Sequence, residues 1–266
     1  GGSCPLPEDD RTPDPNGPTT RLSRFTLEAS NTIDLLSEKV ILDIGPVGVV
    51  HFGGHAAFGK DGYLYVTTGD LGLNPEGANP APTSNSLFGK ILRLTDDGGI
   101  PSDNPYTGGD SIRCNDSRAL TLGSAECQEV FSKGLRNPFN FAMDPNTKGV
   151  RFLINDVGLD DAEEIGEGGD GYAGADYGWP EREGPCQTWI GERKTEPKVC
   201  DLDDRYVEPI HWIFHPETDI GVTGGVVIPN GAWSPELDGE YLYTDLGSDK
   251  VFHMKYNPMH SEVEPS

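Results

Sequence analysis

A histidine that lies among glycines is the residue of this sequence best suited to chemistry. His51 begins the segment His51-Phe52-Gly53-Gly54-His55, whose glycines permit a tight turn that a ligand can approach closely. An imidazole accepts a proton near neutral pH, as the oxidation of a hydroxyl group requires. His51 is therefore a candidate general base, although a lone histidine is more often structural. We give the structural interpretation to His55, His211, His215 and His253.

A second segment offers a guanidinium and an amide side by side. Arg136 and Asn137 lie in Gly134-Leu135-Arg136-Asn137-Pro138-Phe139, just before a short apolar run typical of a strand. The arginine fork donates two parallel hydrogen bonds, which suits a planar carboxylate, a quinone or a developing alkoxide. This pair is therefore a candidate for contact with a cofactor or a substrate.

A third segment is rich in acids. Residues 155–164 read Asn-Asp-Val-Gly-Leu-Asp-Asp-Ala-Glu-Glu, with five acids and a glycine turn. Hard cations such as calcium prefer carboxylate and carbonyl oxygens. The segment lacks the alternating ligand order of an EF-hand loop, so the spacing alone leaves the identity of the metal open.

The elements that must position these residues recur along the chain. A turn, an aromatic or aliphatic strand and an acid occur at 62–70, 149–156 and 239–245, so that Asp70, Asp156 and Asp245 are 86 and 89 residues apart. Each copy precedes a second short strand, at 90–94, weakly at 163–165, and at 250–254. A strand pair at a fixed period, with long loops between, is typical of propeller blades. The alternative is coincidence among aromatic strands, against which the matching order of elements argues.

The repeat does not account for a closed ring. We interpret residues 20–27 as the last strand of an earlier blade, so the chain holds about three blades and a remnant. Propellers close with roughly four to eight blades. Either flanking sequence or another chain is therefore expected to complete the ring. Residues 1–20 are expected to form an extended acidic, proline-rich arm or loop, residues 21–256 the partial propeller, and residues 257–266 a tail.

Composition supports an all-β chain and excludes several classes of protein. The 35 glycines and 22 prolines leave little room for long helices, and no run of apolar residues is long enough to span a membrane. The net charge of −24 makes a nucleic acid or an anionic membrane an unfavourable partner. The acid excess has two interpretations, solubility and cation binding, which the composition does not separate.

The cysteines indicate an oxidising compartment. Cys114 and Cys127, and likewise Cys186 and Cys200, each enclose a short polar loop, which predicts two local disulfides. Zinc-type CxxC spacing is absent, and Asn115-Asp116-Ser117 adds a glycosylation sequon. Cys4 is left to pair outside the chain or to remain free. The first residues do not resemble a signal peptide, so we expect a processed or trimmed chain from a secreted, extracellular or periplasmic protein.

Many of these motifs, in this order, resemble the glucose/sorbosone dehydrogenase family, the soluble sugar dehydrogenases that use pyrroloquinoline quinone (PQQ). The resemblance covers about Arg21 to Lys255, and the cysteine loops are most similar to those of secreted bacterial members. Its motifs are the residues 51–70, Gly89-Lys90-Ile91-Leu92-Arg93-Leu94 with Asp97-Gly98, Ile100-Pro101-Ser102-Asp103-Asn104-Pro105, Arg136-Asn137-Pro138, the residues 156–165, Ala175-Asp176-Tyr177-Gly178-Trp179-Pro180, Thr223-Gly224-Gly225, and the residues 241–254.

The resemblance implies a six-bladed β-propeller with calcium-assisted PQQ at one mouth. It places the general base of the family on His51 and the residue that supports this base on Asp70. Arg136 and Asn137 match positions that face the cofactor and the substrate, and Arg136 would polarise the quinone. The family would then oxidise a sugar or polyol hydroxyl by passing a hydride to the quinone.

The resemblance also implies two calcium sites. The backbone carbonyls of Gly158 and Leu159 match ligands of the calcium that holds the cofactor, and Glu164 and the Tyr177 carbonyl match a second, structural site. The sequence departs from the family at three positions: Val50 replaces an acid before the base, Leu135 a histidine and Leu159 a proline. The cations that clamp the PQQ carboxylates belong to later blades.

Two functions are therefore expected from the sequence. The first is a PQQ- and calcium-dependent dehydrogenase acting on a sugar or polyol. The second is a non-catalytic secreted propeller that binds glycans, mediates adhesion or takes part in extracellular assembly, since a fold does not determine a function. The tryptophans Trp179, Trp212 and Trp233 are interpreted as aromatics that pack between blades.

Overall fold

The computed structural model is all-β, and the parts of the chain that it describes contain no α-helix. It describes residues 19–45, 50–73, 79–115, 123–188, 199–215, 221–248 and 250–255. Nearly all of the expected arm and the whole of the expected tail lie outside these residues. No described helix is long and apolar enough to cross a membrane. The elements are β1 (Thr20–Leu27), β2 (Ile33–Ile44), β3 (Ala56–Phe58), β4 (Leu64–Thr68), β5 (Lys90–Leu94), β6 (Ser111–Ile112), β7 (Glu126–Cys127), β8 (Val130–Lys133), β9 (Pro138–Met143), β10 (Arg151–Asp156), β11 (Ala162–Gly169), β12 (Arg182–Glu183), β13 (Cys186–Gln187), β14 (His211–Phe214), β15 (Val222–Val227), a short 3-10 helix (Pro235–Leu237), β16 (Tyr241–Asp245) and β17 (Lys250–Met254).

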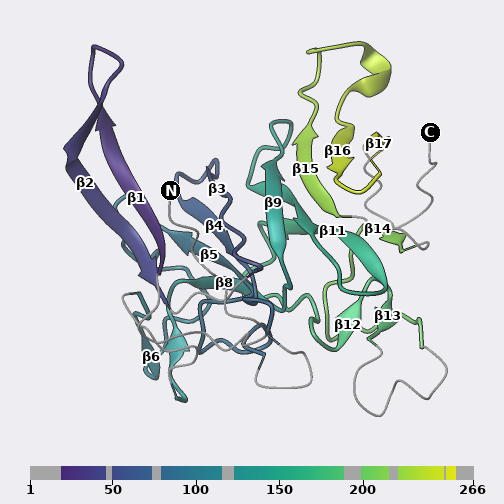
Figure 1. Cartoon of the computed structure of the whole chain (residues 1–266), viewed down its shortest axis with the longest axis horizontal. Coiled ribbons are helices and arrows are strands. Elements are labelled where there is room, and N and C mark those ends of the chain that lie inside the picture. Colours follow the sequence, from purple (N-terminus) through teal and green to yellow (C-terminus); the bar gives the residue numbers. More distant parts are fainter. Residues whose placement is uncertain are drawn as a thin grey trace, which may run out of the picture.

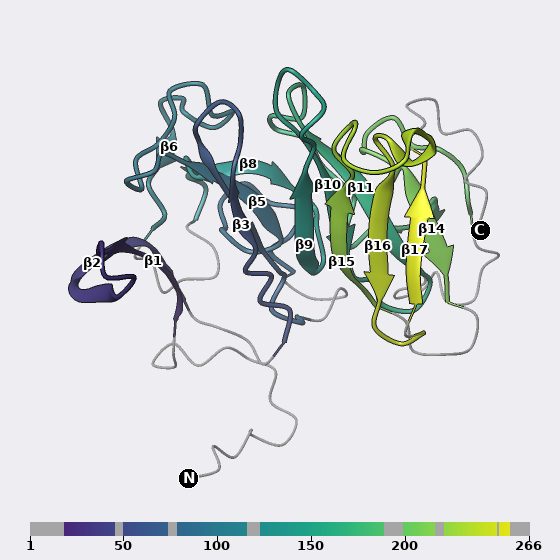
Figure 2. The same cartoon turned by 90° about the horizontal axis from the view of Figure 1, so that it is seen from above.

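Three antiparallel sheets follow one another in space, and each is built from a meander. Their strand orders are β3-β4-β5-β8, β9-β10-β11-β14 and β15-β16-β17. Figures 1 and 2 show the sheets standing side by side, with the hairpin β1–β2 extending away from them. This is the arrangement of consecutive propeller blades, and the chain forms only part of a propeller. The repeated strand of the sequence is the second strand of each blade, namely β4, β10 and β16.

Two elements differ from what the pattern predicted. The remnant is a hairpin rather than a single strand, because β1 pairs with the twelve-residue β2 from Thr20↔Ile44 to Leu27↔Ile33. The weak strand expected at 163–165 is the eight-residue β11, which pairs along the whole of β10. The full length of β11 was not predicted because it consists mostly of glutamate and glycine, and both residue types are depleted in strands.

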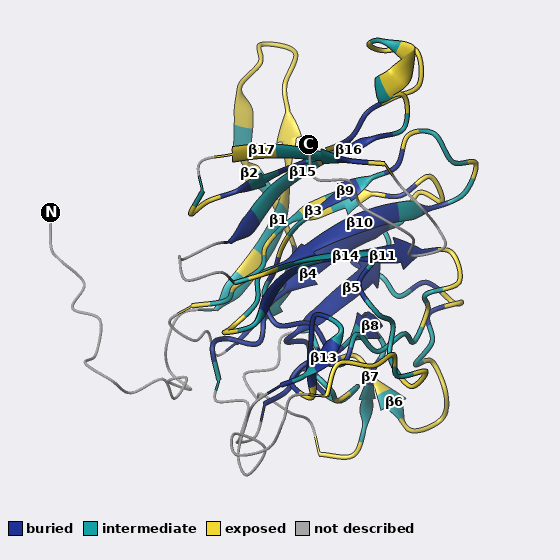
Figure 3. Cartoon of the chain, turned by 90° about the vertical axis from the view of Figure 1, so that its right-hand side faces the viewer, coloured by how far each residue is buried: buried dark blue, intermediate teal, exposed yellow. Residues whose placement is uncertain are grey.

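Apolar layers between the sheets form the core. One lies between the β1–β2 hairpin and the first blade, one between the first two blades, and one between the second and third. The strands β4 and β5 are wholly buried and β10 nearly so, as Figure 3 shows in dark blue. A strand covered on both faces can carry a continuous apolar run instead of alternation, as Phe152-Leu153-Ile154 of β10 does.

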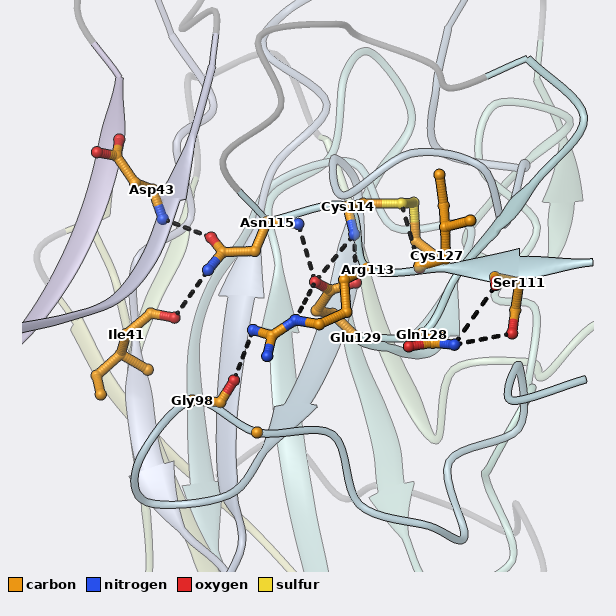
Figure 4. A network of polar contacts seen from close by, with 12 residues as sticks. Ile41, Asp43, Gly98, Ser111, Arg113, Cys114, Asn115, Cys127, Gln128 and Glu129 are labelled. Atoms are coloured by element: carbon orange, nitrogen blue, oxygen red, sulfur yellow. Dashed lines mark hydrogen bonds and ion pairs between the residues drawn. A yellow bond between two sulfur atoms is a disulfide. The ribbon is translucent and has the colours of Figure 1, made fainter.

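Both predicted disulfides are confirmed, between Cys114 and Cys127 and between Cys186 and Cys200. The first belongs to a polar network that fastens the hairpin to the first blade (Figure 4). The buried carboxylate of Glu129 accepts the N–H groups of Cys114 and Asn115 at 2.9–3.0 Å. The Asn115 side chain accepts the N–H of Asp43 at 2.8 Å and donates to the Ile41 carbonyl. The amide of the sequon is thus engaged with β2.

Replacing Cys114 and Cys127 together by serine should lower the free energy of unfolding by about 3 kcal/mol, because the disulfide closes a loop of 13 residues in the unfolded chain. Urea denaturation of the variant and of the oxidised protein measures this difference. Equal midpoints would contradict the expectation, provided that thiol titration shows the disulfide to be closed in the parent protein.

Candidate active site

The repeated acid of each blade contacts the segment that leads into the first strand of that blade, which is β3, β9 or β15. In the second blade the Asp156 carboxylate accepts the N–H groups of Arg136 and Asn137 at 2.9 and 2.6 Å, just before β9 begins. In the third blade Asp245 accepts the N–H of Gly221 at 2.7 Å, just before β15 begins. The acid thus places the residues that precede the first strand at one end of the blade.

In the first blade the acid contacts the side chain, and not the backbone N–H, of a residue that precedes the first strand. Asp70 follows β4, and its Oδ1 lies 2.6 Å from Nδ1 of His51, which precedes β3. The Asp70 carboxyl is 1% exposed and the His51 side chain 17% exposed. An ionised carboxylate can only accept, so Nδ1 donates and the lone pair of Nε2 remains available. Nε2 has no hydrogen-bond partner among the described residues.

The backbone around His51 is constrained so that the ring can reach Asp70. His51 has φ = 57°, in the left-handed region that costs a non-glycine residue roughly 1–3 kcal/mol. Gly69 makes this conformation possible, since a Cβ on Gly69 would lie 2.1 Å from the His51 carbonyl oxygen. Strain of this kind persists only where the surroundings impose it. Here the bond between His51 and Asp70 holds the ring, and the absence of a side chain on Gly69 leaves room for the turn.

Asp70 accepts four hydrogen bonds, and these keep it ionised despite its burial. Oδ1 also accepts the N–H of Gly72 at 2.9 Å, while Oδ2 accepts Asn79 Nδ2 at 2.9 Å and Trp179 Nε1 at 2.8 Å. Burial alone would favour the neutral acid. The hydrogen bond from His51, with the bonds from Asn79 and Gly72, outweighs this effect and lowers the pKa of Asp70.

Trp179 is therefore more than the packing residue that its type suggested. Its ring is 4% exposed, and its N–H reaches an acid that lies 109 residues away in sequence. A buried tryptophan needs an acceptor for its N–H, and this general rule is the one signal that could have indicated a polar role. Nothing in the sequence indicated Asn79, which is a single asparagine in a loop.

The loop that carries Asn79 is held by a buried lysine. Nζ of Lys90, a fully buried residue, donates to the carbonyls of Pro80 and Ala81 at 2.9 Å and to the Phe88 carbonyl. Burial lowers the pKa of Lys90 well below its usual range. The Ala81 N–H in turn donates to Asn79 Oδ1. The first blade thus fixes the second oxygen of Asp70 through its own loop.

Arg136 joins the first two blades beside Asp70. Its carbonyl accepts the Asp70 N–H at 2.8 Å, its Nη1 donates to the Val157 carbonyl at 2.7 Å, and its guanidinium carbon lies 5.5 Å from the centre of the Trp179 ring. The buried atoms Arg136 Nε and Asn137 Oδ1 have no hydrogen-bond partner within the described ranges. The structure therefore places the residues 51, 70, 136 and 137 in one region. Two of their polar atoms, Arg136 Nε and Asn137 Oδ1, have no described partner there.

The acidic segment presents carbonyls that accept no hydrogen bond from the described part of the protein, among them the two that the sequence predicted as calcium ligands. Gly158 and Leu159 follow β10, and their carbonyl oxygens accept no hydrogen bond from any described residue, whereas the Val157 and Asp161 carbonyls accept Arg136 Nη1 and the His215 N–H. Unused carbonyls near carboxylates are the oxygen donors that calcium prefers. Asp156, at the end of β10, has its pKa raised to about 7 by burial.

The two residues of the expected second metal site, Glu164 and Tyr177, make separate hydrogen bonds. Glu164 Oε1 accepts the N–H of Gly184, and burial together with the charges of Asp156 and Glu183 raises the pKa of Glu164 well above its usual range. The Tyr177 hydroxyl donates to the Glu167 carbonyl at 2.6 Å. No hydrogen bond or ion pair joins Glu164 to Tyr177, and no group of three or more His, Cys, Asp or Glu side chains in the described ranges is arranged around a metal position.

Replacing Trp179 by phenylalanine should lower the free energy of unfolding by about 2 kcal/mol, since it removes one hydrogen bond to a buried carboxylate while keeping most of the ring. Trp233→Phe is the matched control, because Trp233 is 60% exposed. Denaturant titration of both variants gives the comparison. A loss no larger than that of the control would mean that the N–H of Trp179 contributes nothing to holding Asp70.

One protein family matches nearly the whole chain. The model of the family described as Glucose / Sorbosone dehydrogenase matches residues 10–265. The aldose sugar dehydrogenase YliI of Escherichia coli is 35% identical over 130 residues, which are 49% of this chain and 29% of that protein. The HIPL1 protein of Arabidopsis thaliana is 29% identical, over 76% of this chain and 29% of that protein. The human Hedgehog-interacting protein is 26% identical, over 87% of this chain and 29% of that protein.

Solved structures support the fold. A glucose dehydrogenase superposes with a TM-score of 0.70 at 24% identity, over 95% of this chain and 65% of the other. The PQQ-bound aldose sugar dehydrogenase of Streptomyces coelicolor superposes with a TM-score of 0.63 at 21% identity, over 92% of this chain and 58% of the other. The chain thus spans under a third of the length of the relatives named above and about three fifths of these two structures.

Proposed function

Because the chain belongs to the glucose/sorbosone dehydrogenase family, we propose that it carries the catalytic base of an oxidoreductase that converts a sugar or polyol hydroxyl to a carbonyl with PQQ and calcium. The observation that carries this proposal is the His51–Asp70 pair, in which a buried carboxylate engages Nδ1 and leaves Nε2 available. PQQ, when bound, supplies the acceptor for the two electrons and the hydrogen that leave the substrate carbon.

The residues of the chain would do the remaining chemistry. Nε2 of His51 accepts the hydroxyl proton of the substrate, and Asp70 stabilises the imidazolium that results. Asp70 also keeps Nδ1 protonated, so that the lone pair stays on the nitrogen that faces the substrate. The strained turn at His51 and the four hydrogen bonds to Asp70 hold the ring in place before substrate arrives, which removes the need to order it during the reaction.

The unused polar atoms fit the cofactor and its metal. Arg136 and Asn137 would bind polar groups of PQQ, since Nε of the one and Oδ1 of the other lack partners among the described residues. The carbonyls of Gly158 and Leu159 would bind calcium. A hard cation takes six to eight oxygen ligands, so the remainder would come from the cofactor and from water. Glu164 and the Tyr177 carbonyl remain our candidates for a second calcium.

Reconstitution tests the proposed reaction. The whole protein, freed of metal with a chelator, is supplied with PQQ and calcium, and the reduction of a redox dye is followed with a series of aldoses and polyols. We expect reduction that requires both additions. Binding of PQQ without dye reduction by any of these substrates would overturn the proposed activity.

A second function, binding without catalysis, is favoured by the similarity to the Hedgehog-interacting protein and to HIPL1. In this case the propeller would bind a glycan or an extracellular protein, and Val50 beside the base would reflect the loss of catalysis. A glycan array and the reconstitution assay separate the two functions. Either function agrees with the two disulfides, and we propose a secreted or periplasmic location.

Removal of calcium should lower the melting temperature under either function. A ligand present at a hundred times its Kd stabilises the folded state by about 2.7 kcal/mol, and a chelator abolishes this contribution. Differential scanning calorimetry with and without excess EGTA measures the shift, and magnesium added back is the control for ionic strength. An unchanged melting temperature would count against bound calcium.

A further inference from the structure

We propose that Glu183 is a positioning residue that turns the carbonyls of Gly158 and Leu159 outward for calcium, an inference that rests on the proposed function. Glu183 lies on β12, far from this loop in sequence, and it is 2% exposed. Its Oε1 accepts the N–H groups of four successive residues, Leu159, Asp160, Asp161 and Ala162. The loop is therefore wrapped around one carboxylate oxygen.

Because the peptide bond is planar, the direction of these N–H groups also fixes the direction of the preceding carbonyls. In a trans peptide the C=O of one residue points opposite to the N–H of the next. The N–H groups of Leu159 and Asp160 point to Glu183, so the carbonyls of Gly158 and Leu159 point away from it. Neither carbonyl accepts a hydrogen bond from a described residue, and the same holds for the carbonyl of Asp160, whose neighbour Asp161 also donates its N–H to Glu183.

A second carboxylate completes the loop. Glu163 Oε1 lies 3.3 Å from the N–H of Gly158 and 2.9 Å from His215 Nε2, while its Oε2 accepts the N–H of Val222 at 2.9 Å. The two glutamates together accept every N–H from residue 158 to residue 162. The protein itself uses the carbonyls at the two ends of the segment, at Val157 and Asp161.

Close packing makes the orientation specific. A Cβ on Gly158 would lie 1.9 Å from the Ala162 carbonyl oxygen and 2.7 Å from Glu183 Oε1. The loop therefore closes tightly around the carboxylate, and a rotated peptide plane would leave a buried N–H or a buried carboxylate without its partner. We expect the carbonyl pair to be oriented before the metal arrives, which removes an ordering cost from binding.

Glu183→Gln tests this role, with Glu129→Gln as a matched control. Glu129 is also fully buried and also accepts successive backbone N–H groups, but it lies in the network of Figure 4 in another blade. Isothermal titration measures the affinity of each folded variant for calcium in the presence of PQQ. Loss of a supporting residue of this kind weakens metal binding about 10- to 100-fold. We expect that loss for Glu183→Gln and an unchanged affinity for Glu129→Gln.

Three outcomes separate this inference from the proposed function. If the parent protein binds no calcium with PQQ, the proposed function fails. If the parent and Glu183→Gln bind calcium equally, or both variants weaken it equally, the positioning role is overturned. If Glu183→Gln does not fold, amide hydrogen exchange of the metal-free parent decides: slow exchange at residues 159–162 before calcium is added supports the inference, and fast exchange that slows only with calcium and PQQ overturns it.

Discussion

Replacing His51 by alanine should lower kcat for sugar oxidation by about a hundredfold to ten-thousandfold, which is the range that a general base contributes. The expected result follows from the geometry of the His51–Asp70 pair, in which only Nε2 of His51 can take the hydroxyl proton. Asp70 is buried, and its oxygens are occupied by four N–H donors. Steady-state dye reduction by the reconstituted protein measures kcat, and fluorescence titration measures PQQ binding.

The matched control is His253→Ala. His253 lies on β17, bonded to Glu240 and 41% exposed, so its loss should leave kcat unchanged. PQQ binding should survive in both variants, since the atoms that would hold the cofactor belong to other residues. A His51→Ala protein that is folded, binds PQQ and retains the parent kcat would exclude His51 as the base.

The second large effect is expected for Asp70→Asn. The carboxylate accepts N–H donors on both oxygens, whereas an amide has one oxygen and one NH2 group. In either orientation the NH2 group meets two donors, either those of His51 and Gly72 or those of Asn79 and Trp179. We expect the His51 tautomer to change and kcat to fall by about a hundredfold or more.

Two further measurements would distinguish this loss of kcat from simple destabilisation of the fold. Nitrogen-15 NMR of the His51 ring reports the tautomer, which should carry its proton on Nδ1 in the parent protein and not in Asp70→Asn. The pKa of Asp70 is lowered, so its contribution to stability is present above the ordinary value of 3.8 and is lost as pH falls through the lowered pKa. Asp70→Asn should lack this component of acid unfolding. An unchanged tautomer with an unchanged kcat would contradict the supporting role.

Features set by residues close together in sequence were predicted, and features set by distant residues were not. The strands at 90–94 and 250–254 were predicted with the bounds that they have, because their ends are marked by local turn residues. The hairpin partner β2 was missed, since exposed and polar residues break its pattern. The disulfides were predictable because each cysteine pair closes a short loop, with separations of 13 and 14 residues.

The sequence by itself determined the all-β class, the repeated acid after the second strand, and the residue types at 51, 70, 136 and 137, since each is set by a pattern within a few residues. Only the tertiary structure decided what those residues touch. The N–H of Trp179 reaches Asp70 across 109 residues, and Glu183 accepts the N–H groups of residues 159–162 from 21 to 24 residues away. Blade packing creates these bonds: a buried donor or acceptor must find a partner wherever the fold brings one, and no local pattern records which partner that is.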